Sequence, residues 1–132
     1  MTDQELVRLA QETLERAYAP YSGFRVAAVL ETSSGAVFTG VNVENASYGL
    51  SCCAERSAVF AAVAAGERAL EKMAIVSDQR TPVRPCGACL QVLWEFGPDL
   101  VLLLAAPGGV VERRRVRDLL PEGFVFPKRP EG

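Results

Sequence analysis

Four cysteines carry the metal-binding chemistry that this sequence offers. They stand in two stretches, SCCAERS over residues 51–57 and PCGAC over residues 85–89, in a chain without histidine. Cys86 and Cys89 are three residues apart, so on the first turn of a helix both thiols face one side and can hold one ion. Thioredoxin-type redox pairs and structural zinc sites with four cysteines use the same spacing. The pair alone therefore leaves metal binding and redox chemistry open.

The adjacent residues Cys52 and Cys53 favour metal binding over redox chemistry. Neighbouring side chains diverge by ~100° on a helix and point to opposite faces of a strand, so both can hardly reach one ion. One of them, with Cys86 and Cys89, gives three protein ligands and an open fourth position. That arrangement is typical of a catalytic zinc, whereas structural zinc is usually closed by four protein ligands. The spacing leaves open which of the two adjacent cysteines binds.

Two charged residues next to Cys53 have roles beside such a metal. Glu55 is placed to reach the fourth position from the side and to pass a proton between a bound water and a substrate. Arg56 could offset the excess negative charge of three thiolates by hydrogen bonding to one of them. A glutamate near a helix start often only complements the helix dipole, and Arg56 could be a surface residue. The predicted open zinc site favours the functional role for both.

The elements around these residues follow from hydrophobic periodicity and turn signals. Thr2 and Glu5 have the spacing of a capping box, and Pro20 stops the helix that follows. Helices are predicted from Thr2 to about residue 18, from about 53 to 65, from 87 to 96, and as a short turn within 117–126. Extended segments are predicted at residues 24–31, 36–44, 72–78, 99–106 and 110–116.

This order of elements predicts an α/β protein, a three-layer α/β/α sandwich around a mixed five-stranded sheet. Both cysteine stretches stand at predicted helix starts, so two helix N-termini of about half a positive charge each would face the metal. The 132 residues suffice for one hydrophobic core and show no linker or repeat. We therefore expect a single domain over residues 1–132.

Composition and charge argue against several classes of partner. The net charge of −2 gives no general attraction to nucleic acid. The run Arg113-Arg114-Arg115 could bind phosphate, but a solvated edge is the commoner interpretation. No segment approaches the ~18 apolar residues of a membrane helix, and the N-terminus lacks a signal-peptide pattern. We expect a cytoplasmic protein, where reduced thiols favour metal or catalytic roles over disulfides.

The two cysteine stretches resemble the zinc deaminase signature. Cys53-Ala54-Glu55 and Pro85-Cys86-Gly87-Ala88-Cys89 are similar to the three-cysteine variant of the H-x-E and P-C-x-x-C pattern. Within that group, the chain resembles the small homotetrameric cytidine deaminases along almost its whole length. The motifs that carry this resemblance are YSGFRVAAVL, GVNVENASYGLSCCAERSA, PCGACLQVLWEF and DLLPEGF. A single CxxC is a weak signal, whereas four motifs in order are a strong one.

The resemblance implies a cytidine deaminase-like fold and zinc-dependent hydrolysis of cytidine and deoxycytidine to uridine and deoxyuridine. Ammonia would be released, and the reaction would serve pyrimidine salvage. The motif makes Cys53, Cys86 and Cys89 the ligands of one Zn²⁺ per chain and leaves Cys52 as a small buried thiol. Glu55 would move the protons between water, the ring N3 and the departing amino group.

Substrate contacts also follow from the resemblance. Phe24 would pack on the pyrimidine ring, the backbone of Ala54 would orient the base, and Asn42 and Glu44 would hold the ribose hydroxyls. Residues implied to act at a subunit boundary are Ala46, Tyr48 and Phe124, the last closing over a pocket. A homotetramer with sites shared between subunits is thereby expected.

Two other hypotheses compete with a free-nucleoside deaminase. One is a relative that acts on another aminated pyrimidine, or on cytosine within nucleic acid. The acidic chain and Glu44, which would repel a phosphate-bearing strand, argue against a polynucleotide. The other is a structural or binding domain held together by zinc, which would need a fourth protein ligand that the sequence does not offer.

Overall fold

The computed structural model describes residues 1–109 and 111–127. Within these residues a five-stranded sheet has the order β2-β1-β3-β4-β5. Its strands are β1 (Val26–Thr32), β2 (Val37–Val41), β3 (Leu70–Ser77), β4 (Val101–Ala105) and β5 (Val111–Arg115). β3 and β4 are parallel and the other neighbouring pairs antiparallel, so the sheet is mixed, as the sequence predicts.

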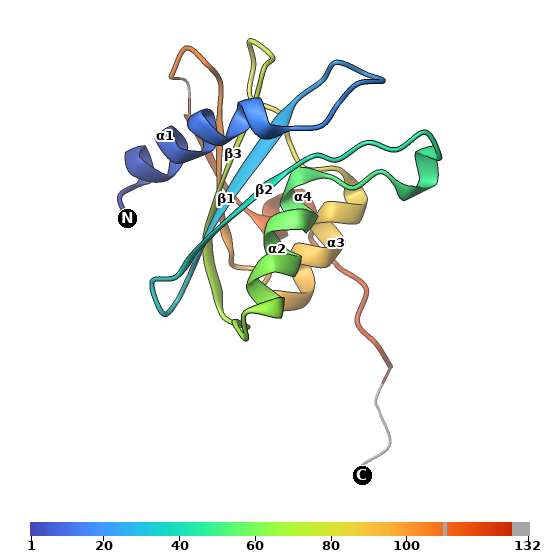
Figure 1. The fold of residues 1–132 in the computed structure, drawn as a ribbon. Helices are drawn as coiled ribbons and strands as arrows, with labels where there is room; N and C mark the ends of the chain where they lie inside the picture. The colour runs from blue at the N-terminus through green and yellow to red at the C-terminus, as the bar shows by residue number, and fades with distance from the viewer. Residues whose placement is uncertain (110, 128–132) are drawn as a thin grey trace.

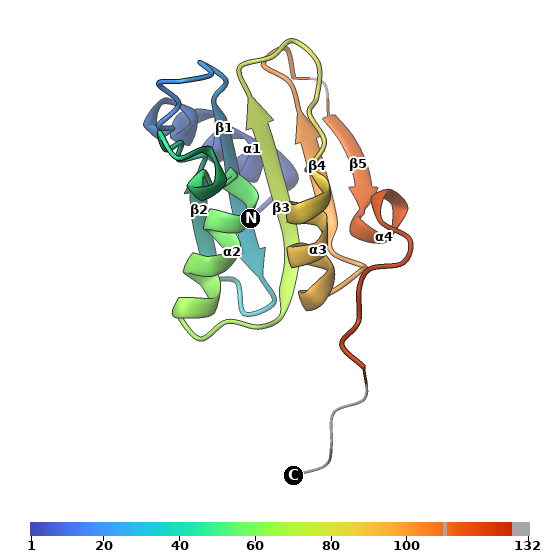
Figure 2. The same cartoon turned by 90° about the vertical axis from the view of Figure 1, so that its right-hand side faces the viewer.

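Helices cover both faces of this sheet (Figures 1 and 2). α1 (Asp3–Thr13) lies against one face, and α2 (Ala54–Ala64) and α3 (Gly87–Phe96) lie against the other. The short α4 (Val116–Leu119) packs beside α3 at the β5 edge. The predicted three-layer α/β/α sandwich is confirmed. No helix in the described part of the chain is long and apolar enough to cross a membrane.

Alternating strand residues build a separate core on each face. Ile75 and Leu104 are buried under α2 and α3, while Ala74 and Leu103 are buried with Leu6 of α1. Successive side chains of a strand point to opposite faces, so both faces of β3 and β4 must be apolar. This explains why these two segments are nearly continuous apolar runs.

The first helix begins as predicted but ends earlier. Thr2 Oγ1 accepts from the Glu5 amide at 3.1 Å while the Glu5 carboxylate accepts from the Thr2 amide at 3.0 Å, which completes the capping box. α1 stops at Thr13, and a single 3₁₀ turn follows over Leu14–Arg16. Tyr18 is extended because its amide donates to the carbonyl of Asn42 at 2.9 Å. The predicted end near residue 18 was wrong because this contact overrides local helical preference.

The second strand is likewise shorter than the predicted segment 36–44. β2 ends at Val41, and the chain then leaves β1 and forms isolated bridges from Val43 to Tyr18 and to Cys52. These bridges place the segment after β2 between the segment before β1 and the segment before α2. The described structure therefore gathers these three chain segments at one end of the sheet.

The arginine run lies on the edge strand β5. Its ion pairs within the described residues are Arg113 with Asp3, Arg114 with Glu112, and Arg115 with Asp99. The three arginine side chains remain 40–61% exposed to solvent in these pairs. The arrangement favours the interpretation of this run as a solvated sheet edge.

Candidate active site

Three cysteine sulfurs converge where α2 and α3 begin. Cys53 is the N-cap of α2, Cys86 is the N-cap of α3, and Cys89 lies in the first turn of α3. Their sulfur atoms lie within 4.8 Å of one another, with 3.9 Å from Cys53 to Cys86 and 3.5 Å from Cys86 to Cys89. Tetrahedral zinc with Zn–S bonds of about 2.3 Å separates its sulfurs by about 3.8 Å. The donor set and its spacing fit one zinc ion.

Cys52 does not join this cluster. Its backbone pairs with Val43 in both directions, at 3.0 and 2.9 Å, which fixes its orientation. Its sulfur accepts from the Ser57 hydroxyl at 3.8 Å instead. Cys52 is half-buried and lines the cavity beside the cluster, rather than being fully buried as expected.

Arg56 contacts the cluster directly. Its Nη2 donates to the Cys53 sulfur at 3.5 Å, so it is not a free surface residue. The pKa of Cys53 is lowered to about 5, first by the hydrogen bond from the Cys89 thiol and also by the hydrogen bond and charge of Arg56. The starts of two helices point at the same sulfurs and add partial positive charge. Thiolate, the form that binds a metal, is thereby favoured at Cys53.

Glu55 lies in the first turn of α2, two residues beyond Cys53. Its side chain is only 5% exposed. Burial raises its pKa to about 7, the nearby Cys53 charge adds to the rise, and the Glu55 amide and Arg56 oppose it. A carboxyl group with such a pKa can both accept and return a proton near neutral pH.

A cavity of about 320 Å³ opens over Cys53, Glu55 and Cys86. Its size lies within the usual range for small-molecule sites. The start of β1, the segment after β2, the start of α2 and the segment before α3 all contribute to its wall. The predicted substrate residues that line it are Phe24, Asn42, Glu44 and Ala54. The structure thus brings seven predicted site residues to one cavity.

Asn42 and Glu44 also hold the segment that precedes β1. The Asn42 side chain accepts from the Val26 amide at 2.8 Å and donates to the Phe24 carbonyl at 2.7 Å. Glu44 Oε1 accepts from the amides of Tyr21 and Ser22, each at 3.0 Å, and Oε2 accepts from the Ser22 hydroxyl. These bonds, led by that of the Ser22 hydroxyl, lower the pKa of Glu44 and keep it ionised.

Three predicted residues lie outside this cavity. Ala46 and Tyr48 are exposed on the loop after β2, and the Tyr48 ring, 79% exposed, packs edge-on against Tyr21 with 6.4 Å between centroids. Phe124 is 65% exposed. Its amide donates to Oε1 of the Gln91 side chain at 2.8 Å, and its carbonyl accepts from Nε2 of the same side chain at 2.9 Å. A single chain does not bring these three side chains to the sulfur cluster.

Sequence reasoning also missed part of the cavity wall. The additional lining residues are Val26, Ser51, Ile75, Val83 and Arg84. Strand periodicity predicts that Val26 and Ile75 are buried, but it does not show which end of the sheet carries the site. Ser22, which binds Glu44, was missed because a serine before a glycine is typical of any turn.

Residues 1–105 match the family described as the cytidine and deoxycytidylate deaminase zinc-binding region. The chain belongs to this deaminase family. The zinc expected from the cysteine pattern agrees with the family's zinc-binding region and with the three-sulfur cluster of this deaminase.

Relatives resemble this deaminase over nearly its full length. A cytidine deaminase from Halalkalibacterium halodurans is 45% identical over 125 residues, which are 94% of this chain and 95% of the relative. The crystal structure of cytidine deaminase from Burkholderia pseudomallei superposes with a TM-score of 0.91 at 49% identity, covering 94% of this chain and 100% of that one. A cytidine deaminase structure from Mycobacterium tuberculosis gives 0.79 at 41% identity, covering 96% and 100%. The predicted fold class is confirmed.

Proposed function

We propose that this deaminase hydrolyses cytidine and deoxycytidine to uridine and deoxyuridine with release of ammonia. The observation that carries the proposal is a buried carboxyl group, Glu55, beside three converging sulfurs under a nucleoside-sized cavity. Its relatives of 40–45% identity named cytidine deaminase support the same reaction.

Cys53, Cys86 and Cys89 would hold one zinc per chain. When bound there, zinc would supply Lewis-acid activation of a water molecule. Among the described residues, these three form the group of His, Cys, Asp and Glu side chains able to hold a metal. The absence of a fourth ligand from this group argues against a closed structural zinc. Arg56 would stabilise the thiolates through its contact with Cys53.

Glu55 would be the general acid and base of the reaction. It would take a proton from the attacking water and transfer it to the N3 atom of the cytosine ring. Protonation of N3 makes C4 more electrophilic. Glu55 would then take the second proton of that water from the hydroxyl added at C4 and deliver it to the departing amino group, so that ammonia leaves and the C4 carbonyl of uridine forms. Its burial supports this role because water cannot compete freely for these protons.

Phe24, Asn42 and Glu44 would position the nucleoside, with the Ala54 backbone orienting the base. Internal contacts occupy one acceptor and one donor of the Asn42 amide and three acceptor positions of Glu44. A carboxylate offers roughly four such positions, and an amide two of each kind. The remaining capacity fits one sugar hydroxyl that donates to Glu44 and accepts from Asn42. This supports acceptance of both ribose and deoxyribose.

A homotetramer would complete the site, with Ala46, Tyr48 and Phe124 meeting neighbouring subunits. Support comes from apolar side chains that the chain leaves exposed, including Tyr48, Leu50 and Phe60, the last 52% exposed on α2. Light scattering should give four times the chain mass of 14.2 kDa. A monomer at micromolar concentration would contradict this assembly. We also place the protein in the cytoplasm, since its four free thiols suit a reducing compartment.

An assay over a panel of nucleosides and nucleotides, with zinc measured on the same sample, tests the proposed function. We expect about one zinc per chain and loss of the cytosine absorbance with both cytidine and deoxycytidine. Cytosine within an oligonucleotide should not react. Stoichiometric zinc without activity on any cytosine nucleoside would refute the proposed function.

A further inference from the structure

The hydroxyl group of Ser22 connects two parts of the cavity wall. It donates to Oε2 of Glu44, and its oxygen accepts from the Phe24 amide at 3.0 Å. Gly23 makes this bridge feasible because its φ of +69° turns the chain back between the two residues. One hydroxyl thus links a carboxylate to the backbone of an aromatic residue, and both residues line the same cavity.

Glu44 depends on this hydroxyl for its orientation. The amides of Tyr21 and Ser22 both donate to Oε1, whereas Oε2 is held by the Ser22 side chain. Without the hydroxyl, Oε2 has no donor from this loop and the carboxylate can turn about its last bond. Ser22 is exposed, so water would replace the lost donor in no fixed position.

Asn42 extends the same network to the start of β1. It holds the carbonyl of Phe24 and the amide of Val26, while Ser22 holds the amide of Phe24. The segment that carries Phe24 is therefore fixed on one side by Glu44 through Ser22 and on the other by Asn42. A change at Ser22 reaches both the sugar-facing carboxylate and the ring-facing aromatic residue.

We propose that Ser22 is a positioning residue that holds Glu44 ready to accept a sugar hydroxyl and couples it to Phe24. This inference rests on the proposed function, which assigns the sugar to Glu44 and the base to Phe24. Ser22 does not touch the reacting atoms. Its removal should therefore weaken nucleoside binding more than it slows the chemical step.

Ser22→Ala tests this role through KM and kcat. We expect KM for cytidine to rise about tenfold, the low end for a hydrogen bond to a charged group, with kcat changed less than about threefold. The loss should be smaller with 2′,3′-dideoxycytidine, which has no hydroxyl for Glu44. Ser22→Thr keeps the hydroxyl and should restore most of the affinity. Equal losses on both substrates, or a loss confined to kcat, would overturn the inference.

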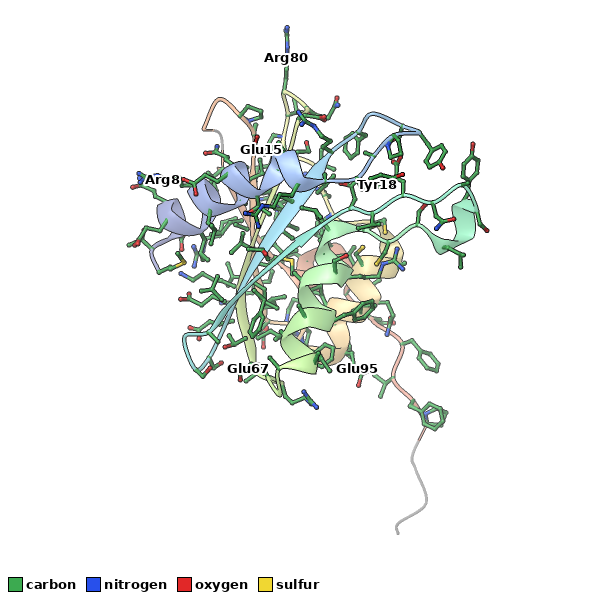
Figure 3. All side chains as sticks on the ribbon, viewed as in Figure 1. Arg8, Glu15, Tyr18, Glu67, Arg80 and Glu95 are labelled. Carbon is green, nitrogen blue, oxygen red and sulfur yellow. The ribbon has the colours of Figure 1, made fainter. Side chains whose placement is uncertain are left out.

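Ser34→Ala is the matched control. Ser34 donates to the carboxylate of Glu67 in the same way, but in the β1–β2 hairpin at the far end of α2, where Figure 3 labels Glu67. Its removal should leave both kinetic constants unchanged. If Glu44→Gln lost affinity and Ser22→Ala did not, the inference would fail and the proposed function would stand.

Amide hydrogen exchange provides a readout that needs no activity. The Phe24 amide donates to the Ser22 hydroxyl, so Ser22→Ala should speed its exchange about tenfold, while Ser34→Ala should not. Unchanged protection of the Phe24 amide would overturn the inference even in a chain inactive on nucleosides.

Discussion

At the scale of single residues, backbone orientation decides which of the adjacent thiols Cys52 and Cys53 can bind the metal. The two thiols are adjacent, yet only Cys53 reaches the other sulfurs, because the paired backbone of Cys52 turns its side chain toward Ser57. Cys53 then caps α2 and points at the start of α3. Spacing alone leaves the choice between the two thiols open, and in the sequence only the family resemblance decides it.

Substitution of each thiol separates the two roles. Cys52→Ala should keep about one zinc per chain and most of the activity, because its sulfur contacts only local groups. Cys53→Ala should lower the zinc content of the purified protein well below half, since a two-sulfur site binds zinc weakly. Zinc analysis of both proteins checks this expectation. Zinc lost from the first variant and retained by the second would reverse the ligand assignment.

At the scale of elements, most of the layout could be predicted because local patterns decided it. The capping box at Thr2, the break between β1 and β2 and the end of α2 near residue 65 all occur where the sequence predicts them. The exceptions are the ends of α1 and β2, where Tyr18 pairs with the chain after Val41. Pairing between segments so distant in sequence leaves no local signal. Tyr18, labelled in Figure 3, lies in the segment between α1 and β1 that forms this pairing.

Gly40 sets the distance between β2 and α2. A Cβ atom at this position would overlap the Ala54 carbonyl oxygen and the Ala58 amide nitrogen, which are backbone atoms that cannot rotate away. Gly40→Ala should therefore destabilise the protein by at least about 2 kcal/mol. It should also lower activity, since the displaced start of α2 carries Cys53 and Glu55.

The matched control for Gly40→Ala is Gly108→Ala, where an added Cβ meets no atom within 4 Å. Urea denaturation of both variants measures the free energy of unfolding. Equal stability of the two proteins would contradict the close approach of β2 and α2.

At the scale of the whole molecule, the metal site joins the two helices that cover one face of the sheet. Cys53 belongs to the start of α2, and Cys86 and Cys89 belong to α3. The hydrogen-bond contacts between sulfurs are weak, so a bound ion would be the main bond between these helix ends. Apolar side chains are exposed on α2 and on the loop before it, among them Phe60, Tyr48 and Leu50. The surfaces that would cover them could not be predicted, because periodicity describes one chain only.

Zinc removal should weaken the attachment between the starts of α2 and α3 and so destabilise the protein. After chelation the melting temperature should fall by at least about 5 °C, because zinc binds the native state far more tightly than the unfolded chain, and activity should be lost. Added zinc should restore both. Cys53→Ala is the control, since chelator should hardly change its melting temperature. A chelated protein with unchanged melting temperature and activity would show that the three sulfurs do not hold a functional metal.

The proposed reaction depends on Glu55 moving protons beside a zinc site formed by three cysteines. Glu55→Gln has nearly the same shape but cannot carry a proton, so it separates metal binding from catalysis. The most direct test measures zinc content and cytidine deamination on the same samples of both proteins. We predict about one zinc per chain in each and a rate at least about 10³-fold lower in the variant. Full zinc with largely intact activity in the variant would show that Glu55 does not carry these protons.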